Sequence, residues 1–301
     1  MRSPLRDLFD FARPETPGER LFFWLFELFV VLALSGHAWS WAVYLGRMEA
    51  PLYPTGLARY LDVSLLMAPD VALGVAAVVT VLLLLGLTHR WPLAYLLALL
   101  GLHLLYVSRF SLGKTPHGVH LLGLTLLSLA LGSLLFRTPL HRRRAAMGFT
   151  FFFVGLSYTL AALSKLVATG PGWADGMHLT LWILEKGTDM MARTGAWTPN
   201  PVQQLLLAHP ELSTVLLAGA LLLELLAFTV WWRPFRLPVL LALVGMHAGI
   251  YATMQISFHA AALELLLLAL PWSRWLNRLL QVQWIARIGR PLLRLAQRCN
   301  A

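Results

Sequence analysis

Nine ionisable side chains lie inside long apolar stretches of this sequence, where a charge is costly. A charged group in the middle of a membrane-spanning helix costs roughly 3 kcal/mol on insertion scales, so such groups usually pair with one another or serve binding and proton transfer. Each of the nine is therefore a candidate functional residue. They are Glu27, His37, His103, His120, Lys165, Glu224, His247, His259 and Glu264.

Lys165 is the most informative of these residues. Tyr158, Ala162 and Lys165 are separated by four and three residues, a spacing that places them on one face of a helix. The small Ala162 would let another helix approach closely. A lysine near the end of a span can extend to the lipid headgroups without doing chemistry. Alternatively, its amine is shielded from water and acts as a base.

His247 and the glutamates inside the apolar stretches can also be either structural or functional residues. His247 lies in the middle of an apolar stretch, either as a hydrogen-bonding link between helices or as a pocket residue. Glu224 and Glu264 would pair with Lys165 or a histidine, or else be protonated and structural. Glu27 is expected to pair with an arginine on the inner side, and we do not expect it to form a site.

The histidines give only a weak indication of a metal site. His117 and His120 are three residues apart, and we expect His259 near them, but no Asp or Glu accompanies the pair. We therefore predict no metal site. The sequence has no glycine-rich phosphate loop, no nucleophile elbow and a single cysteine, Cys299, so nucleotide and thiol redox chemistry are not expected.

The composition places these residues in a membrane protein. The chain has 301 residues, of which 58% are hydrophobic and 13% are charged, with a net charge of +10. A soluble domain carries about 25% charged residues. The arginines stand between apolar runs rather than along one face, which indicates a membrane orientation signal and no nucleic-acid partner.

Eight apolar stretches predict an all-α, polytopic membrane helix bundle with about eight transmembrane helices. The last two are short and closely joined at Gln255–Ser257, so they would alternatively form one broken helix. The predicted spans are Leu21–Leu45, Asp70–Leu87, Trp91–Ser108, His117–Phe136, Ala145–Ala168, Leu212–Trp232, Leu237–Met254 and Phe258–Trp272.

The basic residues predict the orientation of the bundle. With both termini in the cytoplasm, 17 arginines fall on the inner side and 6 lysines or arginines on the outer side, with Lys165 inside a span. This asymmetry follows the positive-inside rule. We therefore expect a multi-pass protein of the inner (cytoplasmic) membrane.

Three further segments complete the predicted organisation. Residues 1–20 form a cytoplasmic segment without the features of a signal peptide, and residues 21–272 form the membrane domain. Within it, the connection Thr169–Glu211 should contain one or two short helices at the outer interface, because it is semi-polar and rich in Trp and Pro. Residues 273–301 alternate Trp or Leu with Arg, which predicts a basic amphipathic cytoplasmic tail at the anionic inner leaflet.

This topology predicts a polar pocket that opens outward among the later helices. Lys165 and His259 fall in the outer part of the membrane, and the connection after Lys165 would cover the pocket from outside. The expected pocket and substrate-binding residues are Tyr158, Trp173, Asp175, His178, Glu224, His247 and His259.

The segment Tyr158–Gly176 reads Y-T-L-A-A-L-S-K-L-V-A-T-G-P-G-W-A-D-G. It resembles the signature of the HTTM family, the membrane module shared by vitamin K-dependent γ-carboxylase and many bacterial proteins. That signature is a Tyr, small residues, Lys-Leu and then Trp-x-x-Gly. Glu224, His247 and Phe258 follow in the order of the family, and the resemblance extends over about residues 19–272. The matching positions of the signature are Tyr158, Ala161, Ala162, Lys165, Leu166, Trp173 and Gly176.

The resemblance implies a chemistry for the predicted pocket. In the carboxylase, the lysine of this motif is regarded as the base that deprotonates reduced vitamin K. Carried onto this sequence, it implies that Lys165 is a catalytic base and that the pocket admits a reduced quinone from the membrane. Gly113–Leu122 resembles the carboxylase stretch with a functional histidine, which makes His117 or His120 the assisting residue.

Three functions remain open from the sequence. The first is a quinol-dependent enzyme, carboxylase-like or an oxidoreductase. The large outer domain with which the carboxylase binds its substrate has no counterpart here, and the connection between Lys165 and Trp173 is longer than in the carboxylase. The second is therefore a non-enzymatic accessory protein for maturation, export or immunity of a secreted peptide, as in relatives of the SdpB type. The third is a structural subunit of a membrane complex. Fold analogy alone does not decide among them.

Overall fold

The computed structural model describes residues 3–50, 53–113 and 117–281, and within these ranges the chain forms helices and no strands. All eight predicted apolar stretches are helical. Five helices are long and apolar enough to cross a membrane, which is typical of a multi-pass membrane protein: Pro17–Leu45, Pro69–Leu87, Pro139–Ala174, Pro210–Trp231 and Arg233–Met254. The other three stretches form shorter apolar helices at Ala94–Phe110, His120–Leu135 and His259–Ala269.

The chain divides into two compact units. The N-terminal unit contains Leu8–Thr150 and Leu270–Ala301, and the C-terminal unit contains Met1–Asp7 and Phe151–Ala269. A short helix, α1 (Pro4–Leu8), lies at the start of the chain, and α6 (Pro139–Thr169) contributes residues to both units. Each unit is described separately below.

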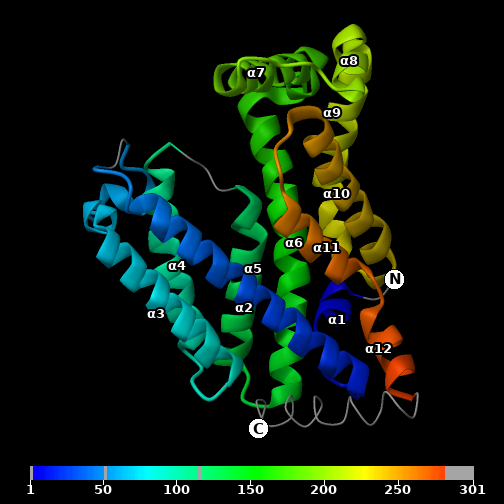
Figure 1. Cartoon of the computed structure of the whole chain (residues 1–301). Helices are drawn as coiled ribbons and strands as arrows, with labels where there is room; N and C mark the ends of the chain where they lie inside the picture. The colour runs from blue at the N-terminus through cyan, green and yellow to red at the C-terminus, as the bar shows by residue number, and fades with distance from the viewer. Residues whose placement is uncertain (1–2, 51–52, 114–116, 282–301) are drawn as a thin grey trace. The chain divides into compact units, whose positions relative to one another are not determined.

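In the N-terminal unit, α2 packs against α3 and α4, and α4 packs against α5 (Figure 1). A capping box begins α2, because Thr16 accepts a hydrogen bond from the amide of Glu19 while the Glu19 side chain accepts one from the amide of Thr16. The unit also contains two short 3-10 helices after α2. The helices of this unit are α2 (Pro17–Leu45), η1 (Gly56–Arg59), η2 (Ser64–Met67), α3 (Pro69–Leu87), α4 (Ala94–Phe110), η3 (His117–Val119), α5 (His120–Leu135) and α12 (Trp272–Gln281).

Glu27 lies in a polar cluster at the centre of the N-terminal unit. Its side chain is completely buried, and it accepts a hydrogen bond of 2.8 Å from the hydroxyl of Tyr95. His89 Nε2 lies 3.2 Å from the Glu27 carboxylate, and Arg142 interacts with the same carboxylate electrostatically. The nearest partners of Glu27 are therefore Tyr95 and His89, and its expected pairing with an arginine stays a prediction. These polar groups compensate one another inside an apolar bundle.

The helix α12 packs against the beginning of α2 in the N-terminal unit. Asn277 accepts a hydrogen bond of 2.7 Å from the Gly18 amide and donates one of 2.9 Å to Thr16 Oγ1. A Cβ added at Gly18 would lie 2.3 Å from the Ser273 carbonyl oxygen, so only glycine permits this close approach. The predicted amphipathic tail is thus helical up to Gln281, and its remaining residues, 282–301, lie outside the described residues.

We expect Asn277→Ala to loosen α12 from α2. The substitution removes two hydrogen bonds worth about 1 kcal/mol each, so amide hydrogen exchange in α12 and at Gly18 should accelerate about 30-fold. The neighbouring exposed Arg278 provides the control, since Arg278→Ala removes a side chain without touching this contact. Equal exchange in both variants would show that Asn277 does not hold the two helices together.

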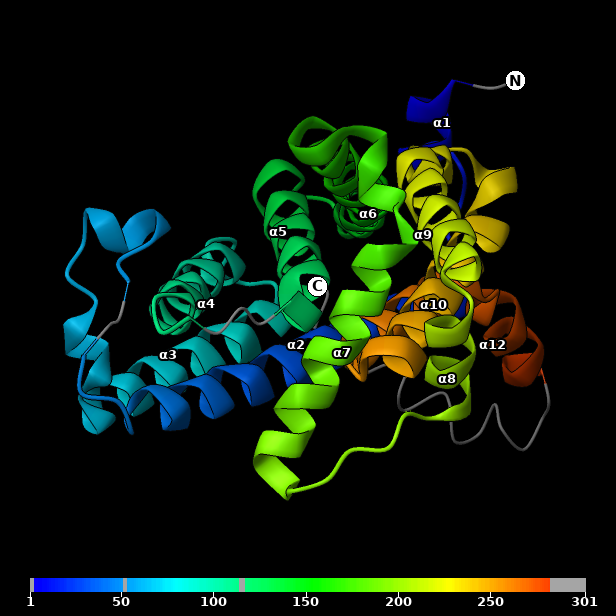
Figure 2. The ribbon, with the colours of Figure 1, turned by 90° about the horizontal axis from the view of Figure 1, so that it is seen from above.

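The C-terminal unit consists of long helices with one helix lying across their ends. The second half of α6 runs beside α9 and α10, while α7 lies across their tops in both Figure 1 and Figure 2. Below α7, the side chains of Leu179, Ile183, Leu206 and Leu217 form a buried apolar cluster. The helices of this unit after α6 are η4 (Gly170–Ala174), α7 (Gly176–Thr194), α8 (Pro201–Ala208), α9 (Pro210–Leu225), η5 (Leu226–Trp231), α10 (Arg233–Met254) and α11 (His259–Ala269).

The connection predicted to carry one or two short helices contains α7 and α8. The 19 residues of α7 exceed the predicted length, because its apolar residues repeat at helical spacing against the buried cluster. The last two apolar stretches are interrupted at Gln255, which adopts a left-handed conformation with φ of 54° and ends α10. A broken helix would be interrupted in the same way, so the number of spans formed by these two stretches stays a prediction.

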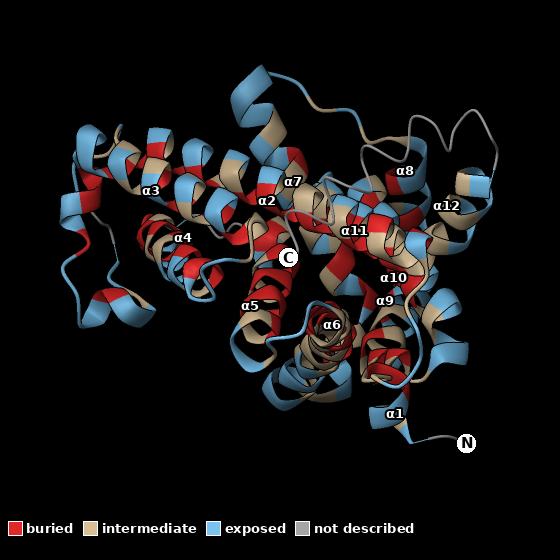
Figure 3. Cartoon of the chain, turned by 90° about the horizontal axis from the view of Figure 1, so that it is seen from below, coloured by how far each residue is buried: buried red, intermediate tan, exposed pale blue. Residues whose placement is uncertain are grey.

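Many apolar side chains on the long helices are exposed. Figure 3 shows such exposed positions in pale blue along α3. Exposed apolar side chains in this number are expected where lipid covers the helices. Examples are Leu32, Val78, Val81, Leu84, Val215 and Leu222.

Candidate functional site

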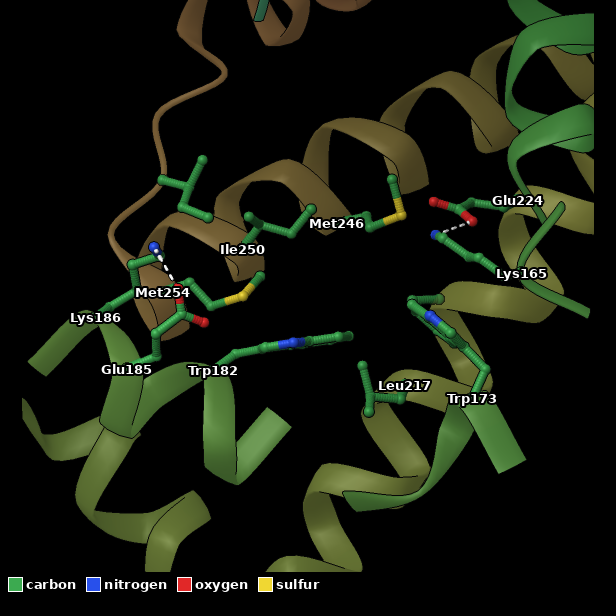
Figure 4. Close-up of a pocket in the computed structure, with 12 residues that line it drawn as sticks. Lys165, Trp173, Trp182, Glu185, Lys186, Leu217, Glu224, Met246, Ile250 and Met254 are labelled. Atoms are coloured by element: carbon green, nitrogen blue, oxygen red, sulfur yellow. Dashed lines mark hydrogen bonds and ion pairs between the residues drawn. The ribbon is translucent and has the colours of Figure 1, made fainter. Parts of the chain in front are cut away.

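An ion pair between Lys165 and Glu224 is the centre of the candidate site. Lys165 Nζ lies 2.5 Å from Glu224 Oε2, and the dashed line in Figure 4 marks this contact. The Lys165 side chain is 27% exposed and the Glu224 side chain 9% exposed. The amine therefore points to a partner inside the unit rather than outward as a snorkelling lysine would.

The end of α9 places Glu224 opposite Lys165. One residue after Glu224 the α-helix ends and continues as the tighter η5, which leaves backbone carbonyls without their usual helical donors. The hydroxyl of Thr159 lies 3.4 Å from the carbonyl oxygens of both Glu224 and Leu225, and it accepts a hydrogen bond of 3.2 Å from the Phe228 amide. Since Thr159 and Lys165 share α6, these bonds fix Glu224 relative to the amine.

The short helix η4 brings Trp173 over the amine of Lys165. The chain turns at Gly170, which has φ of 64°, a backbone conformation that favours glycine. Lys165 Nζ then lies 4.3 Å from the centroid of the Trp173 ring, a cation–π contact. Gly176 anchors the end of this turn, because its amide donates a hydrogen bond of 2.9 Å to Thr214 Oγ1 at the beginning of α9.

A pocket of about 360 Å³ lies beside the ion pair. This volume falls within the range that small-molecule sites usually occupy. Figure 4 shows the Lys165–Glu224 pair on one side of the pocket and Lys186 with Glu185 on the other. The remaining lining residues are apolar or aromatic: Trp173, Trp182, Leu217, Ala220, Met246, Ile250, Met254 and Ile256.

Lys186 differs from Lys165 in its electrostatic surroundings. Its Nζ lies 3.2 Å from Glu185 and 3.2 Å from Asp189, both on the same helix. Partial burial alone would lower the pKa of Lys186, but the hydrogen bonds and charges of the two carboxylates outweigh it and raise the pKa above its ordinary value. Lys186 therefore stays protonated at neutral pH and is no candidate base.

Tyr158 and His247 form a second polar pair in the C-terminal unit. The Tyr158 hydroxyl lies 2.6 Å from His247 Nε2, and the ring of Phe258 packs 4.9 Å from the His247 ring. His247 Nδ1 is buried and has no hydrogen-bond partner among the described residues. Neither Tyr158 nor His247 lines the pocket, so their predicted place in it is not what the structure shows.

Three other predicted pocket residues have local roles. The Asp175 side chain accepts a hydrogen bond of 2.9 Å from the Met177 amide and caps α7, while the residue itself is exposed. His178 stacks on Trp182, and its Nδ1 lies 3.2 Å from the Trp173 carbonyl oxygen. His259 is exposed and contacts Ser257. None of the three lines this pocket, so their role as substrate-binding residues stays a prediction.

The hydrogen bond by which Asp175 caps the beginning of α7 can be tested by mutation. Asp175→Ala should lower the stability of the protein by about 1 kcal/mol, because it leaves an amide at the start of α7 without a partner. Asp175→Ser should restore most of this loss, since serine is also a good N-cap. The midpoint of thermal unfolding in detergent measures both variants, and a serine variant as unstable as the alanine variant would contradict the capping role.

The predicted histidine pair belongs to the N-terminal unit. His117 lies in η3, and His120 begins α5, where its Nε2 is 2.7 Å from the Tyr106 hydroxyl. Because Lys165 belongs to the other unit, the assistance of Lys165 by His117 or His120 stays a prediction. Among the described residues, no group of three His, Cys, Asp or Glu side chains is arranged to hold a metal ion.

Sequence reasoning missed the far side of the pocket. Trp182, Glu185 and Lys186 lie on one face of α7, and the spacing of Met246, Ile250 and Met254 by four residues places these three on one face of α10. That spacing was the available signal. It could not be interpreted, however, without knowing which faces of α7 and α10 meet.

No match was found among family models, curated proteins or solved structures. The candidate site therefore rests on its own geometry. The resemblance to the HTTM family stays an expectation from the segment Tyr158–Gly176.

Proposed function

We propose that this protein binds a lipid-soluble quinol in the pocket beside Lys165 and accepts a proton from it. The observation that carries the proposal is the Lys165–Glu224 pair at the wall of a largely apolar pocket. An apolar pocket with few polar groups at defined positions is the usual form of a site for such a molecule.

The residues of the pocket fit a reduced quinone. Its ring would lie against the aromatic and apolar walls formed by Trp173, Trp182 and Met246. Its hydroxyl group would reach the Lys165–Glu224 pair, the polar group on that side of the pocket. When bound, a reduced quinone would supply a weakly acidic hydroxyl and two electrons, which molecular oxygen would take up, so that the quinol is oxidised to the quinone and oxygen is reduced to hydrogen peroxide.

Lys165 is the proposed base, and Glu224 holds its amine at the wall of the pocket. The Lys165 amine would take the proton of the quinol hydroxyl and become an ammonium beside Glu224. Trp173 stabilises the resulting cation through its ring face, at 4.3 Å.

We also propose that the protein crosses the inner membrane eight times, has both termini in the cytoplasm and is of the HTTM type. The eight apolar helices and the 17 to 6 distribution of basic residues support it. In this arrangement, α7 lies at the outer interface and the pocket opens toward the outer side.

A non-enzymatic role is the second candidate. One observation favours it, because the polar groups of the unit satisfy one another in pairs: Lys165 with Glu224, and Tyr158 with His247. Such pairs also serve as links between membrane helices without any chemistry. In that case the protein would act as an accessory to a secreted peptide or as a subunit of a membrane complex.

Mass spectrometry of the purified protein separates the two candidates. The protein is extracted gently, and its bound lipids, quinones and proteins are identified. We expect a quinone that is lost from Lys165→Ala, because this variant removes half of the polar pair. A stable protein partner without any quinone, unchanged by Lys165→Ala, would favour the accessory role.

A further inference from the structure

We infer that the apolar chain of the quinol lies in a groove between α9 and α10 and that the molecule enters sideways from the lipid. This inference rests on the proposed function and names the part of the site that holds the chain. Four features of the C-terminal unit support it: a second cavity that adjoins the pocket, open space at three glycines, the polarity of the lining and the exposure of the rim.

The second cavity has a volume of about 350 Å³. It adjoins the pocket, because residues of the same stretch of α9 and α10 line both cavities. A molecule whose polar ring lies beside Lys165 would therefore extend its chain along these two helices. The shared residues are Leu217, Ala220, Met246, Ile250 and Met254.

Three glycines leave the groove open. Gly219 belongs to α9, and Gly245 and Gly249 belong to α10. A Cβ added at any of the three would meet no atom within 4 Å, so these positions face empty space rather than a packed neighbour. A larger side chain at each position would occupy the space that a ligand chain would otherwise fill.

The groove offers no polar partner to an occupant. Thr253 is its one polar side chain, and the Thr253 hydroxyl donates to the Gly249 carbonyl oxygen of its own helix at 2.9 Å. Along the adjoining pocket, each of the two lysines is paired with a carboxylate. The site thus matches a molecule with an uncharged head and an apolar chain, and an anionic phospholipid headgroup would find no unpaired cation in it.

The rim of the groove is open to the surroundings. Val215 is 68% exposed and Leu216 is 51% exposed, and both lie on the α9 wall. Because α9 and α10 belong to candidate membrane spans, these surroundings are lipid. The chain of a quinol dissolved in the bilayer can therefore enter the groove without crossing the water phase.

The test compares two naphthoquinones that share a ring system, phylloquinone with a long chain and menadione without one. Protein in lipid nanodiscs is equilibrated with empty nanodiscs that carry the probe, and the probe in each population is extracted and quantified. We expect the wild-type protein to retain both. Gly245→Leu should weaken phylloquinone retention at least tenfold and leave menadione retention unchanged, because the leucine fills the groove and not the ring pocket.

Control variants distinguish a filled groove from misfolding and from a general effect of adding a leucine. Gly74 in α3 also faces open space but lies outside the cavity, so Gly74→Leu should retain both probes. Menadione retention reports that the Gly245→Leu protein is folded, and Gly249→Leu is an independent second variant. Unchanged phylloquinone retention in both groove variants, or equal loss of both probes, would overturn the inference and leave the proposed function standing. Wild-type protein that retains neither probe would overturn both.

Discussion

Replacing Lys165 by arginine should reduce quinol-dependent oxygen uptake at least about 100-fold, as much as replacing it by alanine. A general base contributes a factor of roughly 100 to 10,000 to a rate, and a guanidinium keeps its charge but does not accept a proton. The measurement uses purified protein in nanodiscs with reduced phylloquinone. The expected equality of the two variants is what distinguishes a base from a cation that only pairs with Glu224.

A matched control removes another cation from the connection Thr169–Glu211. Arg193 is exposed in the last turn of α7 and does not line the pocket, so Arg193→Ala should retain the full rate. Full activity of Lys165→Arg would contradict the proposal, because it would show that position 165 needs only a positive charge. The accessory role would then be the better explanation of the Lys165–Glu224 pair.

Gly176→Ala should destabilise the C-terminal unit far more than Gly172→Ala, although both glycines belong to the same short segment. A Cβ at Gly176 would lie 2.1 Å from the Pro210 carbonyl oxygen and 2.9 Å from the Thr214 amide nitrogen. Since these are backbone atoms, α7 itself must move away from α9. We expect a loss of about 1–3 kcal/mol, measured as a lower midpoint of thermal unfolding.

Gly172 provides the control within this segment. A Cβ at Gly172 would meet no atom within 4 Å, so Gly172→Ala should leave the unfolding midpoint nearly unchanged. Because Trp173 and Trp182 stand on either side of Gly176, the Gly176→Ala variant should also lose bound quinone. An unfolding midpoint equal to that of Gly172→Ala would show that α7 and α9 do not approach as closely as described.

The helices were predictable because apolar length and helix-ending residues are local properties of the sequence. All eight apolar stretches form helices, and α6 ends just before Gly170, where the chain turns. The pairing of Lys165 with Glu224 was only one of several alternatives that the sequence allowed. Glu224 is 59 residues away on another helix, so periodicity around Lys165 could not select it over Glu264 or over a snorkelling side chain.

The differences at the site share a physical cause. Asp175 was expected to cover the pocket from outside, but its side chain caps the first turn of α7. His247 was expected at the pocket wall, yet its ring turns to Tyr158 and Phe258. In both cases a nearby partner determines the direction of the side chain, and the order of residues along a chain does not reveal such partners.

The contact of Asn277 with Gly18 has a consequence for biosynthesis. The N-terminal unit contains residues from both ends of the chain, with α12 held against the beginning of α2. A ribosome makes α2 early and α12 late, so the start of α2 lacks this neighbour while nearly all of the remaining chain is being inserted. The first helix inserted is thus among the last to be completed.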